Sequence, residues 1–436
     1  MIYYVLRFYA RMGLWANFRH IYLEGFEHIP EHYHVIFGLN HPTAFIDPIA
    51  LGTHVDAPCW YMLRGDKFVN RPVRWFLHQI QNLPIWRERD GGRAAVRKNI
   101  QTMSYATDKV VEGEPTIILS EGLCKHERRL RTIQRGTARM MFQAWKKDKA
   151  KPVCIVPVAA NYTESNAFRS HLTLTASAPI YAADYVEAFR ADSRETVDVV
   201  TAELERRLRA TVIHVEDRKR DGLVDKLLPL VQHSFPDVGY PPVLRGDTFT
   251  RAQHAAVEAV NAMESYEANA FESELDDYLR RLTAADVTDS GVAYPEYGSM
   301  ARAVGLWLLG PIATLGFLIY FPAAGITQRR TEKMVSNPQF FSSVRFGIGL
   351  VVNVVYLLVA TLLAGLLFGW FALVIPVLFP LLGYFYLVWW ESFTLWRKAA
   401  RTKSLSDGQL ARFRKERADL LRQVGVAASA PAGERA

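Results

Sequence analysis

A histidine and an aspartate follow an apolar run that has the composition of a strand. The run covers residues 34–39, and His41 and Asp47 come directly after it. An imidazole titrates near neutral pH, and a carboxylate that accepts a hydrogen bond from the ring fixes its tautomer and stabilises the protonated form. Pro48 disfavours a helical backbone at Asp47, so the chain is able to turn and bring the two side chains together. The spacing permits a dyad that activates a hydroxyl group.

The same residues also allow a purely structural interpretation. Asp47 followed by Pro48 is typical of a helix start, with the aspartate as N-cap and the proline in the first helical position. A single histidine after a strand is more often structural than catalytic. The dyad therefore depends on support from other segments of the chain.

Four segments, in order and at agreeing spacing, resemble the motifs of the PlsC-like glycerolipid acyltransferase family. These enzymes acylate glycerol 3-phosphate or 1-acylglycerol 3-phosphate. The first motif is an Asn-His pair with a following Asp, matched by Asn40, His41 and Asp47. Five residues separate His41 from Asp47, where most members have four. The longer spacer resembles a branch that includes some glycerol-3-phosphate acyltransferases.

The other three motifs lie between residues 83 and 158. An apolar run ending in arginine corresponds to residues 83–87 and places Arg87. A strand ending in Pro-Glu-Gly is echoed by Ser120, Glu121 and Gly122, and an apolar strand with a central proline is echoed by residues 153–158. The resemblance covers roughly residues 20–165, and more vaguely extends to about residue 235.

One departure from the family pattern concerns phosphate binding. The family often has Thr-Arg-Ser after Glu-Gly, whereas this chain has leucine, cysteine and Lys125, so the usual arginine is absent. A compensating charge is expected from Lys125, Arg128, Arg129 or Arg135. A planar guanidinium grips two oxygens at once, which also suits Arg87, although Arg87 stands in a charged segment where a surface position is the simpler interpretation.

The resemblance implies a set of roles for these residues. His41 is expected to act as the general base, oriented by Asp47, on a glycerol hydroxyl that attacks a thioester carbonyl. The expected substrate-binding residues are Asn40, Arg87, Glu121, Gly122, Lys125 and Arg135. The chain has no Gly-x-Ser-x-Gly elbow, so we expect direct transfer without an acyl-enzyme. No metal and no tightly held cofactor are implied, since acyl-CoA or acyl-carrier protein enters as a co-substrate.

Alternating apolar and helical patterns predict an α/β domain, a mixed sheet flanked by helices. The strands are expected near residues 21–25, 34–39, 57–63, 116–120, 153–162 and 171–180. Helical spacing follows over residues 192–231 and again over residues 250–285. We interpret residues 21–235 as the acyltransferase domain and residues 236–300 as a helical connector.

Both ends of the chain indicate contact with a membrane. Residues 1–20 interleave aromatic residues with arginines, which favours an amphipathic interfacial helix, and a soluble core-packing helix is the alternative. Residues 301–392 contain two uncharged runs. The run over residues 346–390 is long enough for a hairpin of two crossings, whereas residues 303–328, with Pro311 and Pro322, also suit a re-entrant segment.

Charge and composition place the expected domains relative to a membrane. Basic residues on both sides of the 346–390 run, and throughout residues 393–436, favour a cytoplasmic position. We expect the inner membrane, with the catalytic domain and a basic tail facing the cytoplasm and a loose end to the tail. The net charge of +8 suits an anionic membrane surface, and no nucleic-acid motif is present. Three scattered cysteines fit a reduced compartment.

The sequence predicts a membrane-bound acyltransferase of phospholipid synthesis. Two alternatives remain open at this point. One is acylation of another lysophospholipid or an aminolipid, and the other is a lipid-binding membrane protein that keeps the fold without turnover. The presence of both His41 and Asp47 favours an enzyme, while the missing arginine of the third motif favours the binding protein. The acceptor, the acyl-chain length, the donor and the oligomeric state are not encoded in any pattern we can identify.

Overall fold

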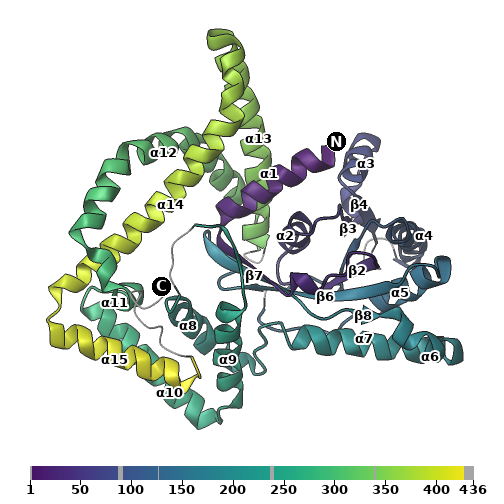
Figure 1. Ribbon diagram of the computed structural model, residues 1–436, viewed down its shortest axis with the longest axis horizontal. Coiled ribbons are helices and arrows are strands. Elements are labelled where there is room, and N and C mark those ends of the chain that lie inside the picture. Colours follow the sequence, from purple (N-terminus) through teal and green to yellow (C-terminus); the bar gives the residue numbers. More distant parts are fainter. Residues whose placement is uncertain (1, 87–91, 126, 236–239, 338–339, 427–436) are drawn as a thin grey trace.

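A mixed sheet lies at the centre of the N-terminal half of the molecule. The computed structural model describes residues 2–86, 92–125, 127–235, 240–337 and 340–426 (Figure 1). The strands of the sheet are β1 (Phe18–Glu24), β2 (His34–Leu39), β3 (Trp60–Arg64), β4 (Asn82–Ile85), β5 (Thr116–Leu119), β6 (Val153–Tyr162), β7 (Ser170–Ala176), β8 (Ile180–Tyr181) and β9 (Val243–Arg245).

Strand β2 runs through the middle of the sheet between β5 and β6. The strand order is β4-β3-β5-β2-β6-β7-β1-β9, with β8 paired to β6. The first five of these strands are parallel, and β7 turns back antiparallel to β6. The segments that leave the carboxyl ends of β5, β2 and β6 are therefore neighbours. This confirms the expected mixed sheet, and it brings three of the four motifs to one edge.

Helices cover the sheet because both faces of its central strands are apolar. Every residue of β2 and β6 is buried, and the two sides form separate apolar cores, one including Phe37 and the other Ile36. The helices of this half are α1 (Ile2–Asn17), α2 (Ile46–His54), α3 (Arg71–Gln79), α4 (Gly92–Val111), α5 (Gly136–Lys147), α6 (Val186–Ala191) and α7 (Ser193–Arg209).

Two differences from the expected strands have local causes. The strand expected over residues 171–180 is split into β7 and β8, and the segment between them contains Pro179, which lacks the amide hydrogen that a ladder needs. Strand β9 pairs with β1 in the segment that we interpreted as a helical connector, so the sheet extends past the boundary drawn at residue 235. Three residues are too few to give a detectable alternating pattern.

Helix α1 contacts the sheet-containing half through its two arginines. Arg11 Nε donates to the carbonyl oxygen of Thr53 at 2.8 Å, and Arg7 donates to that of Val55, so both satisfy carbonyls at the end of α2. The other face of the helix leaves Tyr4 and Phe8 about 60% exposed. The helix thus combines a packed face with an exposed aromatic face.

A third core joins two helical segments that are distant in the sequence. The helices are α8 (Asp221–Gln232), α9 (Thr248–Ala262), α10 (Ser265–Ala284), α11 (Asp289–Ala293) and α15 (Asp407–Gln423). Leu227, Phe271 and Leu421 belong to one buried cluster. In the described part of the tail, α15 therefore packs on the connector helices. The end of the tail, residues 427–436, lies outside the described residues.

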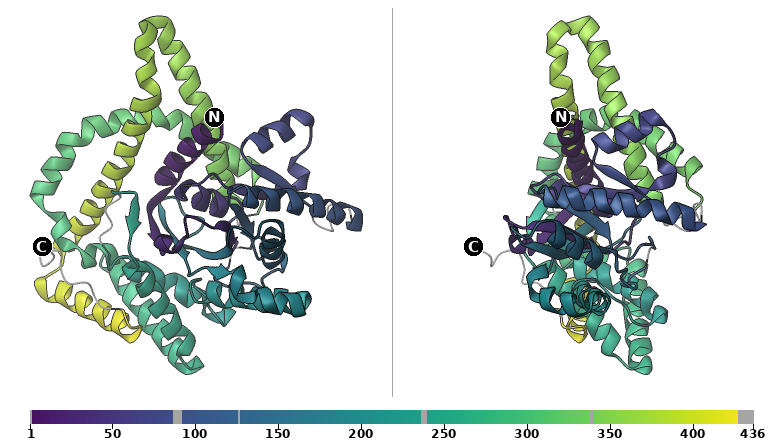
Figure 2. Two further views of the ribbon diagram at one scale, coloured as in Figure 1. Left: turned by 45° about the vertical axis from the view of Figure 1, so that its right-hand side comes forward. Right: turned by 90° about the vertical axis from the view of Figure 1, so that its right-hand side faces the viewer.

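Three long apolar helices lie between α11 and α15: α12 (Met300–Met334), α13 (Phe341–Phe368) and α14 (Ile375–Arg401). Two helical segments, residues 300–334 and 341–404, are long and apolar enough to cross a membrane. Figure 2 shows α13 and α14 as a hairpin that projects from the rest of the molecule. Near its tip Leu366 and Leu367 are 83% and 78% exposed. Leucine side chains exposed to this extent favour contact with an apolar environment. The molecule is therefore suited to membrane association.

Helix α12 is continuous across both of its prolines. It follows a curved path beside α14 (Figure 1), as expected when proline removes helical hydrogen bonds. Gly316 lies against the backbone of Leu382, and Gly383 lies against the ring of Tyr320, so small residues let α12 and α14 approach closely.

A buried ion pair joins the hairpin to the sheet-containing half. Arg169, just before β7, donates to Glu391 of α14 at 2.5 Å and 3.0 Å, and both side chains are less than 10% exposed. Arg19 donates to the same carboxylate at 3.1 Å. Glu391 follows the uncharged run in the sequence. Its ion pairs with Arg169 and Arg19 link α14 to the sheet.

Candidate active site

The loop between β2 and α2 carries the His-Asp motif. Helix α2 begins at Ile46 with Phe45 as its N-cap, so Asp47 lies in the first helical turn and does not cap the helix. The structural interpretation of Asp47-Pro48 as N-cap and first helical residue is therefore wrong by two positions. The six residues before the helix bend back toward it, which brings His41 over Asp47.

His41 and Asp47 are in hydrogen-bond contact. Nδ1 of His41 lies 3.0 Å from Oδ2 of Asp47, and the aspartate is fully buried. A carboxylate accepts, so Nδ1 carries the proton and Nε2 keeps a lone pair. Among the described residues Nε2 has no hydrogen-bond partner, and the side chain of His41 is 11% exposed. The ring is therefore held in the tautomer that a general base needs.

Asp47 accepts further hydrogen bonds that fix its orientation. The amide of Thr43 donates to Oδ2 at 3.0 Å, while the hydroxyls of Thr43 and Tyr162 donate to Oδ1 at 2.6 Å and 2.5 Å. Sequence reasoning missed both residues. Thr43 lies inside the motif, and Tyr162 is the last residue of the predicted 153–162 strand, but nothing in the pattern shows that either reaches Asp47.

Glu121 lies beside the dyad at the end of β5. Its Oε1 accepts the backbone N–H of His41 at 3.3 Å. Burial raises the pKa of Glu121 from its ordinary 4.5 to about 7, and the hydrogen bond from His41 partly offsets this effect. Gly122 follows with φ of +71°, a left-handed conformation that favours glycine. The third motif thus places a titratable carboxyl group and a tight turn next to His41.

Asn40 is held by the neighbouring strand. Its amide nitrogen donates to the carbonyl oxygen of Ala160 at 3.1 Å, and its oxygen accepts the N–H of Ala160 at 2.7 Å. Both ends of the amide are therefore used to fix the start of the His41 loop to β6. This contact makes Asn40 a positioning residue.

A cavity of about 600 Å³ opens next to the dyad. Asn40, Pro42 and Glu121 line it, so it reaches both neighbours of His41, although His41 itself is not among the lining residues. Its remaining wall comes from the segments after β5 and β6 and from α8. The lining cations are Lys125, Arg128 and Arg129.

Each cation of this cavity has an acidic partner. Lys125 lies 2.7 Å from Glu127, Arg128 donates to Asp225 at 2.8 Å, and Arg129 grips Asp221 through two nitrogens. Lys125 is a third exposed, whereas the side chain of Arg129 is 11% exposed. Lys125 is thus the cation of the three that a ligand reaches most readily.

Two predicted phosphate-binding residues lie elsewhere. Arg135 caps the start of α5, donates to Asp198 at 2.8 Å and lines a different pocket, so the structure does not bring it together with the dyad. Arg87 lies outside the described residues. Among the described residues no group of three or more His, Cys, Asp or Glu side chains is placed to hold a metal ion.

The start of helix α13 contacts the His41 loop directly. The amide of Ala44 donates to Ser343 Oγ at 3.1 Å, and the backbone of Gly347 lies against the ring of Phe45. The membrane-type hairpin therefore begins at the wall of the site. The arrangement as a whole places a fixed imidazole, a polar cavity and the foot of an apolar hairpin together, which suits proton abstraction from a hydroxyl of an amphipathic molecule.

Comparison with known proteins identifies the sheet domain. Residues 20–161 match the model of the family described as Acyltransferase. A solved structure, the 1-acyl-sn-glycerophosphate (LPA) acyltransferase PlsC from Thermotoga maritima, is 16% identical, with 47% of this chain and 79% of that chain covered and a TM-score of 0.33. No curated protein matches the chain at a significant level. The family match covers the segment in which the four motifs lie and agrees with the acyltransferase resemblance predicted from them.

Proposed function

Because residues 20–161 are an acyltransferase domain, we propose that the protein makes phospholipid precursors. It transfers a fatty acyl chain from acyl-CoA or acyl-carrier protein to a hydroxyl of glycerol 3-phosphate or 1-acylglycerol 3-phosphate. The observation that carries this proposal is the His41–Asp47 contact at the carboxyl end of β2, beside a polar cavity and the foot of an apolar hairpin.

The proposed chemistry is a single direct transfer. An alcohol is almost wholly protonated at neutral pH, so Nε2 of His41 accepts the proton as the acceptor oxygen attacks the thioester carbonyl carbon. The carboxylate of Asp47 stabilises the resulting imidazolium. When the tetrahedral intermediate collapses, the C–S bond breaks and His41 returns its proton to the departing sulfur. The products are an ester and a free thiol.

The acceptor phosphate is proposed to occupy the cavity beside Glu121. Lys125 is its cation there, because it lines the cavity and is more exposed than Arg129. Displacement of the Lys125–Glu127 contact would free the ammonium for a phosphate oxygen. The role assigned to Arg87 from the family motif remains a prediction.

The molecule is proposed to lie on the cytoplasmic side of the inner membrane. Hairpin α13–α14 has basic residues near both of its ends, Arg345 at one and Arg397 and Lys398 at the other, and such residues favour the cytoplasm. This orientation would keep the catalytic half on the side that holds acyl thioesters. The exposed aromatic face of α1, with Tyr4 and Phe8, would lie in the membrane interface.

Product analysis with purified protein tests this function. The protein in detergent is given labelled acyl-CoA or acyl-carrier protein with one acceptor at a time: glycerol 3-phosphate, 1-acylglycerol 3-phosphate, another lysophospholipid or an aminolipid. We expect an acylated glycerophosphate. An acylated product from only the last two acceptors would move the activity to the first alternative. Stable binding of lipid without any product would show a binding protein and overturn the proposal.

A further inference from the structure

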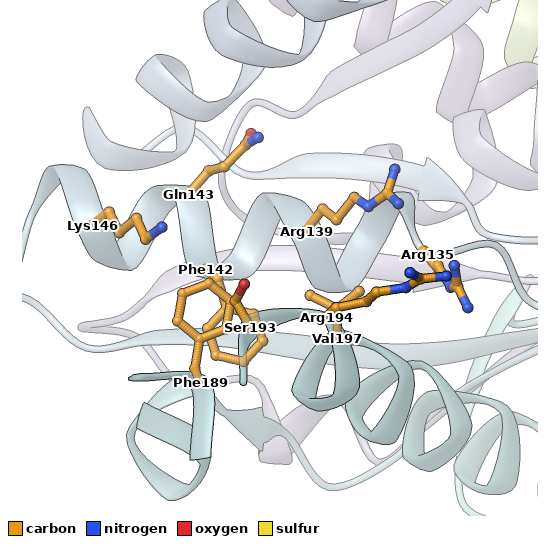
Figure 3. Close-up of a pocket in the computed structure, with 9 residues that line it drawn as sticks. All are labelled: Arg135, Arg139, Phe142, Gln143, Lys146, Phe189, Ser193, Arg194 and Val197. Atoms are coloured by element: carbon orange, nitrogen blue, oxygen red, sulfur yellow. The ribbon is translucent and has the colours of Figure 1, made fainter. Parts of the chain in front are cut away.

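A second pocket, apart from the dyad, is lined by cations. It has a volume of about 290 Å³ and lies between α5 and the segment around the start of α7. Four of its lining residues are basic and none is acidic: Arg135, Arg139, Lys146 and Arg194. Figure 3 shows Lys146 toward one end of the pocket and the three arginines toward the other. A concentration of like charge at one hollow favours an anionic occupant.

Most of this positive charge is not neutralised by neighbouring carboxylates. Arg135 has a carboxylate partner, Asp198. Within the described ranges Arg139 and Arg194 have no carboxylate within salt-bridge distance, and both are exposed. Lys146 Nζ lies 4.9 Å from the ring centre of Phe189. These cations are therefore available to a ligand, in contrast to the paired arginines of the cavity beside His41.

The floor of the pocket is aromatic. The rings of Phe142 and Phe189 are stacked, with centres 4.0 Å apart and planes within 11°, and they lie between the cationic ends in Figure 3. Phe142 is buried and Phe189 is half-buried, so the floor is rigid and partly accessible. An apolar floor with cations at its rim suits a ligand that carries both an apolar ring and phosphate groups.

The arginine end of the pocket is attached to the third motif. Arg135 is the N-cap of α5, and the preceding residue, Gln134, donates its N–H to the carbonyl oxygen of Ser120 at 2.7 Å. Ser120 stands next to Glu121, which accepts the N–H of His41. The arginine end of the pocket is thus linked through the backbone to the third motif, while the proposed acceptor cavity is a separate hollow lined by Glu121 itself.

The helices that line the pocket lie away from the tip of the hairpin. In Figures 1 and 2 the tip of α13–α14 is at one end of the molecule, and α5, α6 and α7 lie toward the opposite side. A site in this position meets solutes in water and not the headgroups of the bilayer. The pocket has a small volume, about 290 Å³, which suits a nucleotide. A carrier protein would instead bind through a broad surface.

We propose that this pocket binds the phosphorylated nucleotide end of an acyl-CoA donor. The inference rests on the proposed function, and it assigns the donor class that the sequence left open. The flexible arm between nucleotide and thioester then leads past Arg135 and the third motif toward His41. Donor and acceptor phosphates would occupy two separate cationic pockets.

Direct binding tests the pocket without any need for turnover. Calorimetric titration with adenosine 3′,5′-bisphosphate should show saturable binding, and adenosine without phosphates should bind far more weakly. Arg139→Glu and Arg194→Glu should each weaken bisphosphate binding by about tenfold or more, the effect of losing one charge-assisted hydrogen bond. The matched control is Arg245→Glu on β9, an exposed arginine at the far edge of the sheet, which should leave binding unchanged.

Kinetics with the same variants place the pocket in the reaction. Both substitutions should raise KM for acyl-CoA by about tenfold and leave KM for the acceptor unchanged. Equal bisphosphate binding by all variants would overturn the proposal. Two further results would overturn the proposal if the wild-type protein does not bind the bisphosphate. One is that the substitutions raise KM for acyl-carrier protein, and the other is that they abolish binding to anionic vesicles. Specific bisphosphate binding without any acyl transfer would keep the pocket and remove the proposed function.

Discussion

The two ends of strand β2 carry the same chemical pair in different surroundings. His34 at the start lies 3.0 Å from Asp148, and His41 just past the end lies 3.0 Å from Asp47. Asp148 is at the surface, and the hydrogen bond from His34 lowers its pKa. Asp47 is fully buried and accepts bonds from Thr43 and Tyr162 as well. A His–Asp pair alone is therefore no sign of a catalytic site.

Position in the sheet separates the two pairs. In open α/β sheets ligands bind beyond the carboxyl ends of the strands, where the connecting loops leave a crevice. The carboxyl end of β2 has Glu121 from β5, the cavity of about 600 Å³ and the foot of α13 beside it. His34 at the amino end lies beside the turn after α5. The difference supports the proposal that His41 acts in catalysis, while His34 packs at the opposite end of the strand.

The largest expected effect comes from changing the two aspartates. Asp47→Asn allows the new amide to donate to Nδ1 of His41, which moves the ring proton to Nε2 and removes the base. Turnover should decrease by about 100-fold to 10,000-fold, the range of general-base catalysis. Asp148→Asn should change turnover less than threefold or so, since its histidine touches no substrate. Equal losses in steady-state assays would break the comparison.

The second effect concerns the α13–α14 hairpin, which contacts the loop at the carboxyl end of β2. Glu391→Ala leaves Arg169 buried without its carboxylate, which should lower the free energy of unfolding by about 3–5 kcal/mol. Glu187→Ala, which breaks an exposed pair with Arg190, should cost about 0–1 kcal/mol. Denaturant unfolding in detergent micelles measures both. If the two variants unfold alike, the hairpin is not fixed to the sheet by this pair.

A third, smaller effect tests the hydrogen bonds that orient the base. Tyr162→Phe removes one donor to Asp47 and should slow turnover by about tenfold, the equivalent of one hydrogen bond to a charged group. Tyr33→Phe, near the other end of β2, should have no measurable effect on turnover. Thermal unfolding of both variants controls for loss of structure. A normal rate in Tyr162→Phe would show that the Asp47 orientation is set elsewhere.

The fourth effect is a pH dependence of stability, which we expect at the carboxyl end of β2 and not at its amino end. The unfolded chain releases the Glu121 proton near pH 4.5, while the folded chain keeps it to about pH 7. The folded state thus binds more protons over this window, and its stability decreases as pH rises through it. Glu121→Gln stays neutral, so its gain in Tm over the wild type should grow between pH 5 and pH 8. A constant difference would contradict the raised pKa of Glu121.

A matched control for this pH effect lies at the other end of the strand. The lowered pKa of Asp148 contributes stability above its ordinary value of 3.8 and loses it only at lower pH. In a His34→Gln background, which has no imidazole at this position to titrate, Asp148→Asn should therefore give a Tm difference that is constant between pH 5 and pH 8. Scanning calorimetry at several pH values distinguishes the two variants.

The sequence predicted what depends on local patterns. Strand β6 was predicted at residues 153–162, and the motif residues do follow the carboxyl ends of their strands. Local patterns carry this information because alternation and apolar runs reflect which faces are buried. The mixed sheet and the uncharged hairpin are also predicted from such local patterns.

Contacts between distant segments could not be predicted in this way. Tyr162 reaches Asp47, Ser343 reaches Ala44, and Glu391 reaches Arg169, and none of these pairs shares a periodicity. Arg135 is expected near the acceptor because it follows the basic run after the third motif and could replace the arginine that this motif lacks. The start of α5 instead carries it to a different pocket, because Gln134 is bound to the end of β5 and the helix runs on from there.

The most direct measurement compares His41→Ala with His34→Ala in the acyl-transfer assay. Both variants lose one imidazole next to one end of β2, and both leave an aspartate without its histidine. We predict that His41→Ala loses turnover by about 100-fold to 10,000-fold while His34→Ala retains it in the fraction that folds. Full turnover in His41→Ala, in protein whose thermal unfolding matches the wild type, would contradict the role of His41 as the base.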